Sequence, residues 1–224
     1  MTFLSFAWTW LTSRQQWHGA DGIPIRLLQH LGYSGLALLV AGLIALPLGV
    51  AIGHTGRGAF AIVSLANIWR AIPTLGLLIM MVVYLGFSPL TWLIPLVALA
   101  IPPILVNAYE GVLGVDPDLI DAASGMGMTG WQVLRRVEIP VAMPLIMLGL
   151  RTAAIFIVAT ATIAAEIGTG GLGRYIIDGL ASNEYGQVAG GAALVVLLAL
   201  LVQVVFVGLR RLVVPAGLRR AART

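Results

Sequence analysis

Residues 168–173 have a spacing associated with nucleotide binding. They read Gly-Thr-Gly-Gly-Leu-Gly, which satisfies the pattern G-x-G-x-x-G. That pattern holds a dinucleotide only where it joins a strand to a helix in a βαβ unit. Here it follows a long apolar stretch without strand signals. We interpret it as a hinge or gate loop at the end of a membrane helix, with a plain turn as the alternative.

Charged side chains inside apolar stretches are the next candidates, because an ionisable group at membrane depth usually has a function. Arg70 stands three residues before Pro73, which breaks a helix. Non-helical backbone at that depth is tolerated only against protein or a water-filled cavity. We therefore predict a solute path or gate here. The alternative is a structural Arg70 that binds the backbone carbonyls left without a donor by Pro73. Glu166 would attract a cationic solute, or would simply lie in headgroup water. The predicted path residues are Asn67, Arg70, Pro73, Thr74, Glu166, Gly170 and Gly171.

Several catalytic chemistries are excluded by residue types that the chain lacks. It has no Cys, which excludes thiolate nucleophiles, thiolate metal sites and disulfides. All 13 basic residues are Arg, and without Lys there is no Walker A loop and no Schiff base. The 3 His residues show no metal-ligand spacing. We therefore predict a chain that is not an enzyme and carries no cofactor of its own.

The elements that must position these residues are membrane helices. The 224 residues are 59% hydrophobic and 10% charged, whereas a soluble domain carries about 25% charged residues. Too little polar surface remains to cover a soluble globule, and lipid accepts an apolar exterior. A helix needs about 20 residues to cross a bilayer. The five candidate stretches are Leu31–Gly53, Ala59–Gly86 with an interruption at residues 70–73, Leu90–Val112, Val141–Ala165 and Ala189–Leu212.

Arginine placement orients these helices by the positive-inside rule. With the C-terminus in the cytoplasm, eight Arg residues lie in cytoplasmic segments and three in external ones, and the opposite orientation reverses this ratio. We therefore predict an external N-terminus and a cytoplasmic C-terminus. The same distribution accounts for the sequence pI of about 10.1 without a nucleic-acid partner.

Small residues recur at helical spacing in or beside two of these stretches. Gly49–Gly53 and Gly186–Gly190 are G-x-x-x-G pairs, which let helix backbones approach closely. We interpret both pairs as packing positions rather than binding sites.

The polar loop between the third and fourth stretches has strong helix signals. Asp116 before Pro117 reads as an N-cap followed by an N1 proline. A short helix should run to about residue 126 and stop at Gly127. Residues 129–132 (Thr-Gly-Trp-Gln) then form a capping box that opens a second short helix. We expect Pro140 to end that helix and to begin the fourth span.

This loop resembles the EAA loop of bacterial ABC importer permeases. The family pattern is Glu-Ala-Ala, three residues, Gly, nine residues, then Ile-x-Leu-Pro, and this chain has Asp-Ala-Ala at 121–123, Gly127 and Val-Glu-Ile-Pro at 137–140. The departures are Asp for Glu, Val for Ile and Ile for Leu. In the family the loop docks into a groove on the ATPase subunit, and small residues at 122–124 would let that partner approach closely. The residues implied in coupling are Asp121, Ala122, Ala123, Gly125, Gly127, Trp131, Arg135, Ile139 and Pro140.

Three further segments resemble the osmoprotectant branch of these importers, the permeases for glycine betaine, choline, carnitine and proline. They are residues 70–75 (Arg-Ala-Ile-Pro-Thr-Leu), 149–153 (Gly-Leu-Arg-Thr-Ala) and 167–173. The resemblance implies a small quaternary ammonium or zwitterionic cargo. Two rivals remain. One is a permease for another solute, such as ergothioneine, methionine or an anion, and the other is a membrane protein without a transport role.

The resemblance also implies an architecture and a set of partners. The fold would be all-α and MetI-like, in a bacterial inner membrane. Two ATPase chains that bind ATP and Mg, a second permease chain and an external solute-binding protein would complete the transporter. We expect an external interfacial segment at residues 1–29, a transmembrane domain at 30–213 that includes the coupling loop 114–140, and a basic cytoplasmic tail at 214–224.

Overall fold

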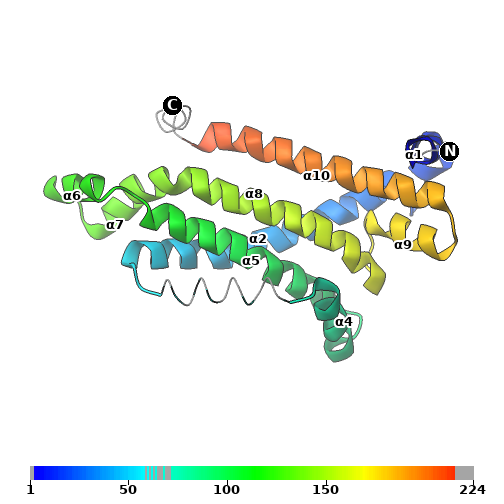
Figure 1. Cartoon of the computed structure of the whole chain (residues 1–224), viewed down its shortest axis with the longest axis horizontal. Coiled ribbons are helices and arrows are strands. Elements are labelled where there is room, and N and C mark those ends of the chain that lie inside the picture. Colours follow the sequence, from blue (N-terminus) through cyan, green and yellow to red (C-terminus); the bar gives the residue numbers. More distant parts are fainter. Residues whose placement is uncertain are drawn as a thin grey trace. The chain divides into compact units, whose positions relative to one another are not determined.

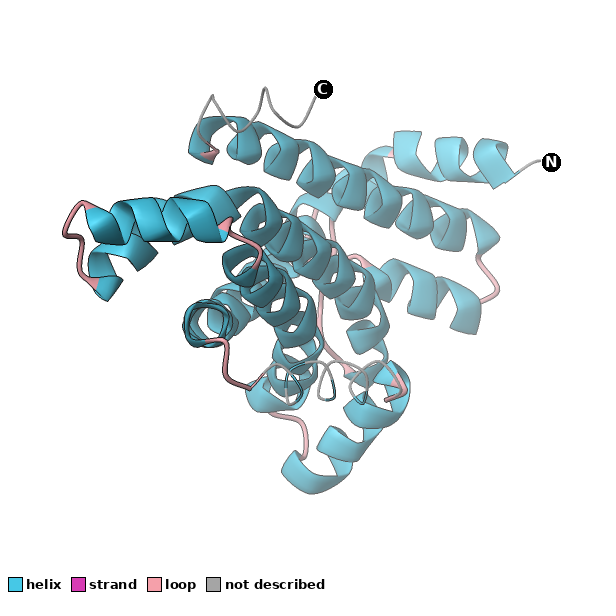
Figure 2. Ribbon diagram, turned by 60° about the vertical axis from the view of Figure 1, so that its left-hand side comes forward, coloured by secondary structure: helices cyan, strands magenta, loops and turns pink. Residues whose placement is uncertain are grey.

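Every regular element of the computed structural model is a helix within the residues that it describes, 3–58, 60, 62, 64, 68 and 72–214 (Figure 2). The long helices in Figure 1 are α2 (Ile23–Thr55), α5 (Pro89–Leu113), α8 (Ile139–Ala164) and α10 (Tyr185–Val213). The short α-helices are α1 (Phe3–Thr12), α4 (Thr74–Leu85), α6 (Pro117–Gly125), α7 (Gly130–Val133) and α9 (Gly173–Ala181). Three further turns have other helix types: η1 (Arg14–Trp17), η2 (Leu134–Glu138) and η3 (Ala165–Ile167).

Four helices in the described part of the chain are long and apolar enough to cross a membrane. They are α2, α5, α10 and the continuous helix Gly130–Ile167, of which α8 is the main part. These four contain the first, third, fourth and fifth predicted stretches. The second predicted stretch is represented by α4, which has 12 residues. Residues 59, 61, 63, 65–67 and 69–71 of that stretch lie outside the description.

The interruption predicted in the second stretch falls where α4 begins. Ile72 and Pro73 are not helical. Pro73 is the N-cap of α4, with φ −65° and ψ 121°. A residue in that extended conformation cannot carry an α-helix onward, so the helix starts afresh at Thr74.

The long helices carry large apolar side chains that remain exposed among the described residues. Leu43 on α2 and both Val204 and Leu212 on α10 are exposed. Water would penalise such a surface at about 25 cal/mol per Å². Lipid does not, so the exposed faces agree with the membrane location that composition predicts.

Two compact units divide the chain, and each long helix supplies residues to both. The first unit is Met1–Leu39, Ile72–Leu99 and Ala154–Val202, and the second is Val40–Ala71, Ala100–Ala153 and Gln203–Thr224. In the first unit, Trp10 of α1 packs edge-on against Tyr175 of α9, with ring centroids 4.9 Å apart. Their core cluster continues into Val158 of α8 and Leu198 of α10.

Close packing confirms the interpretation of the Gly49–Gly53 pair, and in the second pair it is seen at Gly190. In the second unit, a Cβ on Gly49 would lie 2.7 Å from the Leu105 carbonyl oxygen of α5, and a Cβ on Gly53 would lie 2.9 Å from that of Tyr109. In the first unit, Gly190 leaves room for the Trp10 ring. Only glycine permits backbones to approach this closely.

Replacing Gly49 with Ala should therefore destabilise the protein, whereas Gly35→Ala in the same helix should not. The new methyl at position 49 meets backbone, which cannot rotate away, and overpacking of this kind costs about 1–3 kcal/mol. A Cβ at Gly35 meets nothing within 4 Å, and Ala favours a helix over Gly by about 1 kcal/mol. We expect opposite shifts of Tm for the detergent-purified variants, and equal losses would contradict the packing role of Gly49.

Candidate functional site: a two-helix loop and a glycine loop

The polar loop folds into the first helix that its signals predict. The Asp116 side chain caps α6 by accepting the Asp118 N–H at 3.0 Å, and Pro117 occupies the first turn. The helix ends at Gly125, and Gly127 follows with φ +84°. That left-handed conformation strains any residue with a Cβ. Gly127 therefore sets the angle between α6 and α7.

The capping box is confirmed in both of its hydrogen bonds. The Gln132 N–H donates to the Thr129 hydroxyl at 3.4 Å, and the Thr129 N–H donates to the Gln132 side-chain oxygen at 2.8 Å. Two donors at the start of α7 are thereby satisfied within the loop itself. The loop is consequently a built element with a defined shape, as a docking surface requires.

The prediction that Pro140 ends the second short helix is wrong. The chain stays helical from Gly130 to Ile167. Residues Leu134–Glu138 widen into a π-helical turn, in which the Ile139 N–H donates to the Leu134 carbonyl five residues back. A proline breaks an α-helix because it lacks an N–H and its ring meets the carbonyl four residues back. The wider turn moves these carbonyls off the α-helical register, so the helix passes Pro140 without a break.

Most of the predicted coupling residues are accessible on this loop. Large apolar side chains stand out as well: Trp131 is 66% exposed and Met126 is 73% exposed. Exposed apolar groups on an otherwise polar loop mark an interaction surface. The predicted residues that are exposed are Asp121, Ala122, Gly125, Gly127, Trp131 and Arg135, and Ile139 and Pro140 are half-buried in the first turn of α8.

Ala123 corrects one expectation. We expected it among the small residues that leave room for a partner, but it is 2% exposed and packs inside the loop. It lies one residue on from Ala122, and successive residues on a helix point about 100° apart. Ala122 and Ser124 are the small residues that remain open.

A partly buried pair joins the end of α2 to the π-helical turn. The His54 Nδ1 lies 2.7 Å from the Glu138 Oε2, and the Glu138 side chain is 5% exposed. In the same turn, Leu134 packs into the cluster formed by Val112 of α5 and Ile146 of α8. The loop is thus fastened to three long helices of its unit, and movement of the loop would be passed to them.

The glycine loop between η3 and α9 is anchored to α2. Gly168 and Gly171 adopt left-handed conformations, with φ +84° and +90°. The Gly171 N–H donates to the Gln29 side-chain oxygen at 3.0 Å. A Cβ on Gly170 would lie 2.1 Å from that oxygen. Glycine at these positions therefore lets the loop turn and lie directly against α2.

His30 makes a second link from α2 to this loop. The Leu172 N–H donates to its Nδ1 at 3.3 Å, and its Nε2 lies 3.1 Å from the Val158 carbonyl oxygen. An N–H only donates and a carbonyl only accepts, so the ring must be the neutral tautomer with its proton on Nε2. The side chain therefore ties α2, α8 and the start of α9 together.

The other predicted path residues are only partly brought together. Pro73 and Thr74 begin α4, which packs beside η3, where Glu166 lies exposed. Gly170 and Gly171 lie on the loop that follows η3. Asn67 and Arg70 lie outside the described residues.

A polar cluster in the same unit joins α9 to residues at the start of α2. Asp21 pairs with Arg26, and Arg174 pairs with Asp178. The Tyr175 hydroxyl donates to the Asp21 backbone oxygen at 2.5 Å. Burial raises the pKa of Tyr175 to about 12. The phenol therefore keeps its proton, and this hydrogen bond, throughout the physiological pH range.

Sequence reasoning missed Gln29, His30, His54 and Glu138. Gln29 and His30 are adjacent polar residues in a helix that continues as an apolar span, and this was the available signal. Polar groups in such positions need partners, because lipid offers none. Neither histidine lies at metal-ligand spacing: His30 binds backbone groups and His54 binds a single carboxylate.

Apolar helices long enough to span a membrane, joined to a folded polar loop with exposed apolar side chains, define a multi-pass membrane protein. The family model described as "binding-protein-dependent transport system inner membrane component" matches residues 43–217. The glycine betaine/carnitine/choline transport system permease protein OpuCB of Bacillus subtilis (strain 168) is 39% identical over 191 residues, 85% of this chain and 88% of that protein. The carnitine transport permease protein OpuCB of Listeria monocytogenes is 36% identical over 88% of this chain and 90% of that protein.

A solved structure has the same fold. The inward-facing MetNI methionine ABC transporter in its CY5 native crystal form superposes with a TM-score of 0.73 at 24% identity, covering 86% of this chain and 96% of that one. The chain belongs to the family of inner membrane components of binding-protein-dependent transport systems. It is a multi-pass transport subunit, and the resemblance carried by the loop motif is confirmed.

Proposed function

We infer that this chain is the permease subunit of an ATP-driven importer for small quaternary ammonium or zwitterionic osmoprotectants. The proposed cargo is supported by the 39% identity with a glycine betaine/carnitine/choline permease over 85% of this chain. A carnitine permease and a choline permease also lie at 36% identity. Glycine betaine, choline, carnitine and proline-type solutes are therefore the proposed cargo.

The partners follow from the kind of transporter. Two ATPase chains bind ATP and Mg²⁺ and hydrolyse the nucleotide, while this chain has no catalytic role and no cofactor of its own. A second permease chain, identical or different, completes the membrane pore. A solute-binding protein delivers the cargo from outside the bacterial inner membrane, and nucleic acid has no part in the cycle.

The two-helix loop is the proposed ATPase-coupling element, and it faces the cytoplasm. Its exposed Ala122, Met126 and Trp131 would seat in the ATPase, and its links through His54 and Leu134 would pass the movement to the long helices. In this orientation the N-terminal segment 1–29 is external and the tail 214–224 is cytoplasmic. The glycine loop, which follows the fourth predicted span, is proposed to be external.

The proposed solute path uses the residues around the break before α4 and the glycine loop. Arg70 and Asn67 precede the break at Pro73 and Thr74. Gly170 and Gly171 form a proposed hinge in the loop that lies against α2. Glu166 would attract a cationic solute as it leaves the binding protein.

Uptake measurements in a strain without its own osmoprotectant transport test the cargo. The complete transporter should take up labelled choline and glycine betaine, and unlabelled betaine should compete whereas methionine should not. Deleting this chain alone should abolish uptake, because the other subunits cannot form the pore. Competition by methionine without competition by betaine would assign the chain to another solute.

A further inference from the structure

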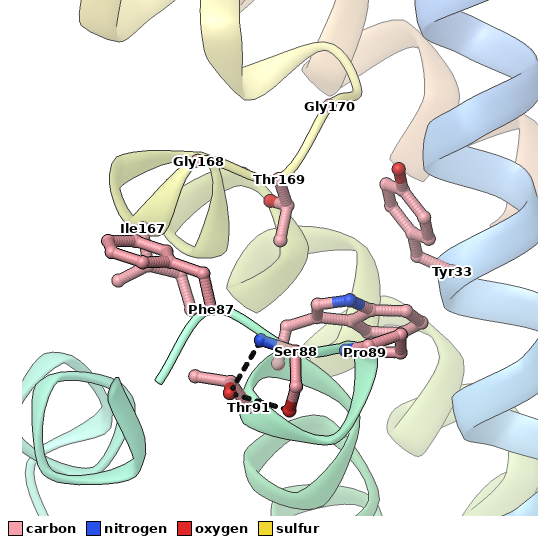
Figure 3. A pocket seen from close by; sticks show the side chains of 10 residues that line it. Tyr33, Phe87, Ser88, Pro89, Thr91, Ile167, Gly168, Thr169 and Gly170 are labelled. Atoms are coloured by element: carbon pink, nitrogen blue, oxygen red, sulfur yellow. Dashed lines mark hydrogen bonds between the residues drawn. The ribbon is translucent and has the colours of Figure 1, made fainter. Parts of the chain in front are cut away.

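A cavity of about 270 Å³ opens in the first unit between α2, the start of α5 and the glycine loop. Drug-sized ligands occupy pockets of roughly 300–1,000 Å³, so this one suits a smaller molecule. Three aromatic side chains line it: Tyr33, Phe87 and Trp92. Figure 3 shows Tyr33 reaching in from α2, with Phe87 beside Ile167 on another side.

The aromatic rings form a corner rather than a flat wall. The ring centroids of Tyr33 and Trp92 lie 4.6 Å apart, with their planes inclined at 50°. A cation placed in such a corner lies within about 6 Å of both rings, the range in which a ring quadrupole attracts it. Phe87, the third aromatic side chain of the lining, is 82% exposed.

The polar features of the cavity also suit a small solute. None of the ten residues that line the cavity is an Asp, Glu, Arg or His, so a cation would be held by ring faces and not by a counter-ion. The Thr169 hydroxyl is buried and has no hydrogen-bond partner among the described residues. A buried hydroxyl without a partner is costly, and a change of rotamer that turns it into the cavity would let a ligand carboxylate or hydroxyl bind it.

The surrounding backbone holds this geometry in place. The Thr91 hydroxyl donates to the Gly86 carbonyl at 2.6 Å and accepts the Ser88 N–H at 3.3 Å, which fixes the turn that carries Phe87. Gln29 fixes the glycine loop through Gly171. Both walls of the cavity are therefore built before any ligand arrives.

We propose that this cavity is a binding site for a trimethylammonium group within the permease itself, with Tyr33 and Trp92 on the cation and Thr169 on the solute's carboxylate or hydroxyl. The inference rests on the proposed function and adds a site on this chain that would take the solute after its binding protein releases it. Cation–π contacts without a counter-ion give modest affinity, which lets a solute enter and leave again.

The test is equilibrium binding to the purified permease–ATPase complex, without its binding protein, in lipid nanodiscs free of choline lipids. Labelled choline is compared with 3,3-dimethyl-1-butanol, which has the same shape and no charge. We expect the neutral molecule to bind at least about tenfold more weakly, since each ring is worth about 2- to 30-fold in affinity for a cation. Equal affinities, or no binding of choline, would overturn the site.

Variants locate the binding. Tyr33→Leu and Trp92→Leu should each weaken choline binding about 2- to 30-fold. Tyr33→Phe keeps a ring, and Tyr84→Leu removes an exposed ring outside the cavity, so both should bind as the wild type does. Unchanged affinity in both Leu variants would overturn the proposal. If either variant fails to accumulate, the comparison of choline with its neutral analogue on the wild type still decides.

Two further arms separate the alternatives. Nanodiscs with phosphatidylcholine should leave choline affinity unchanged, and a loss of affinity there would assign the cavity to a lipid headgroup instead of a solute. Cellular uptake by the wild type is measured in parallel. Absence of choline and betaine uptake would refute the proposed cargo, whereas uptake that both Leu variants leave intact would refute only the site.

Discussion

Trp131→Ala is expected to separate this chain from its ATPase and to abolish transport. Trp131 is 66% exposed on α7, where it contributes little to the chain's own packing. Exposed Trp residues at the centre of an interface are typical hot spots, and their truncation costs about 2 kcal/mol or more, roughly a 30-fold loss of affinity. The measurement is the amount of ATPase that co-purifies with the tagged permease from membranes, together with solute uptake.

Trp8→Ala is the matched control for this experiment. Trp8 is 71% exposed on α1, outside the coupling loop. We expect its replacement to leave the recovery of ATPase unchanged. Ala122→Arg should repeat the Trp131→Ala result by adding bulk to the open face, whereas Ala123→Arg would disturb the loop itself, because Ala123 is buried. If Trp131→Ala retains both the ATPase and transport, the docking assignment of this loop is wrong.

His54→Ala is expected to have the second large effect, by loosening the loop from α2. The Glu138 side chain, which is 5% exposed, would lose the His54 nitrogen that lies 2.7 Å from it. Removing one partner of a buried pair costs about 3–5 kcal/mol, and because the His54 side chain is itself 31% exposed we expect about 2–3 kcal/mol. Transport should fall together with Tm.

Two controls separate the pairing of Glu138 from a general loss of histidine. Glu138→Gln keeps an acceptor for the imidazole N–H and should retain most of the stability. His18→Ala replaces an exposed histidine elsewhere and should change little. Coupling is measured as solute-stimulated ATP hydrolysis by the reconstituted transporter. If His54→Ala matches the wild type in Tm and coupling, the pair is a surface contact without a transmission role.

The sequence by itself determined the membrane environment of this protein, its all-helical class and the local shape of the two-helix loop. The membrane location could be inferred from composition, because 10% charged residues cannot cover a soluble globule. The Asp116 cap, the stop at Gly127 and the Thr129 capping box were predictable, since each depends on hydrogen bonds or dihedral angles within a few residues. The family followed for the same reason, as its motif lies in one short segment.

Tertiary structure decided everything that joins residues far apart in the chain. His30 binds groups that lie 128 and 142 residues away along the chain. The partner of His54, Glu138, lies 84 residues away. No local sequence pattern predicts either contact. The aromatic cavity depends likewise on packing that brings Tyr33 beside Trp92 and the glycine loop. Even Ala123 and Pro140 were misjudged locally, because burial and the π-helical turn arise from how the loop packs on its own unit. Propensity acts over single turns, whereas these contacts are selected by the free energy of packing whole helices together.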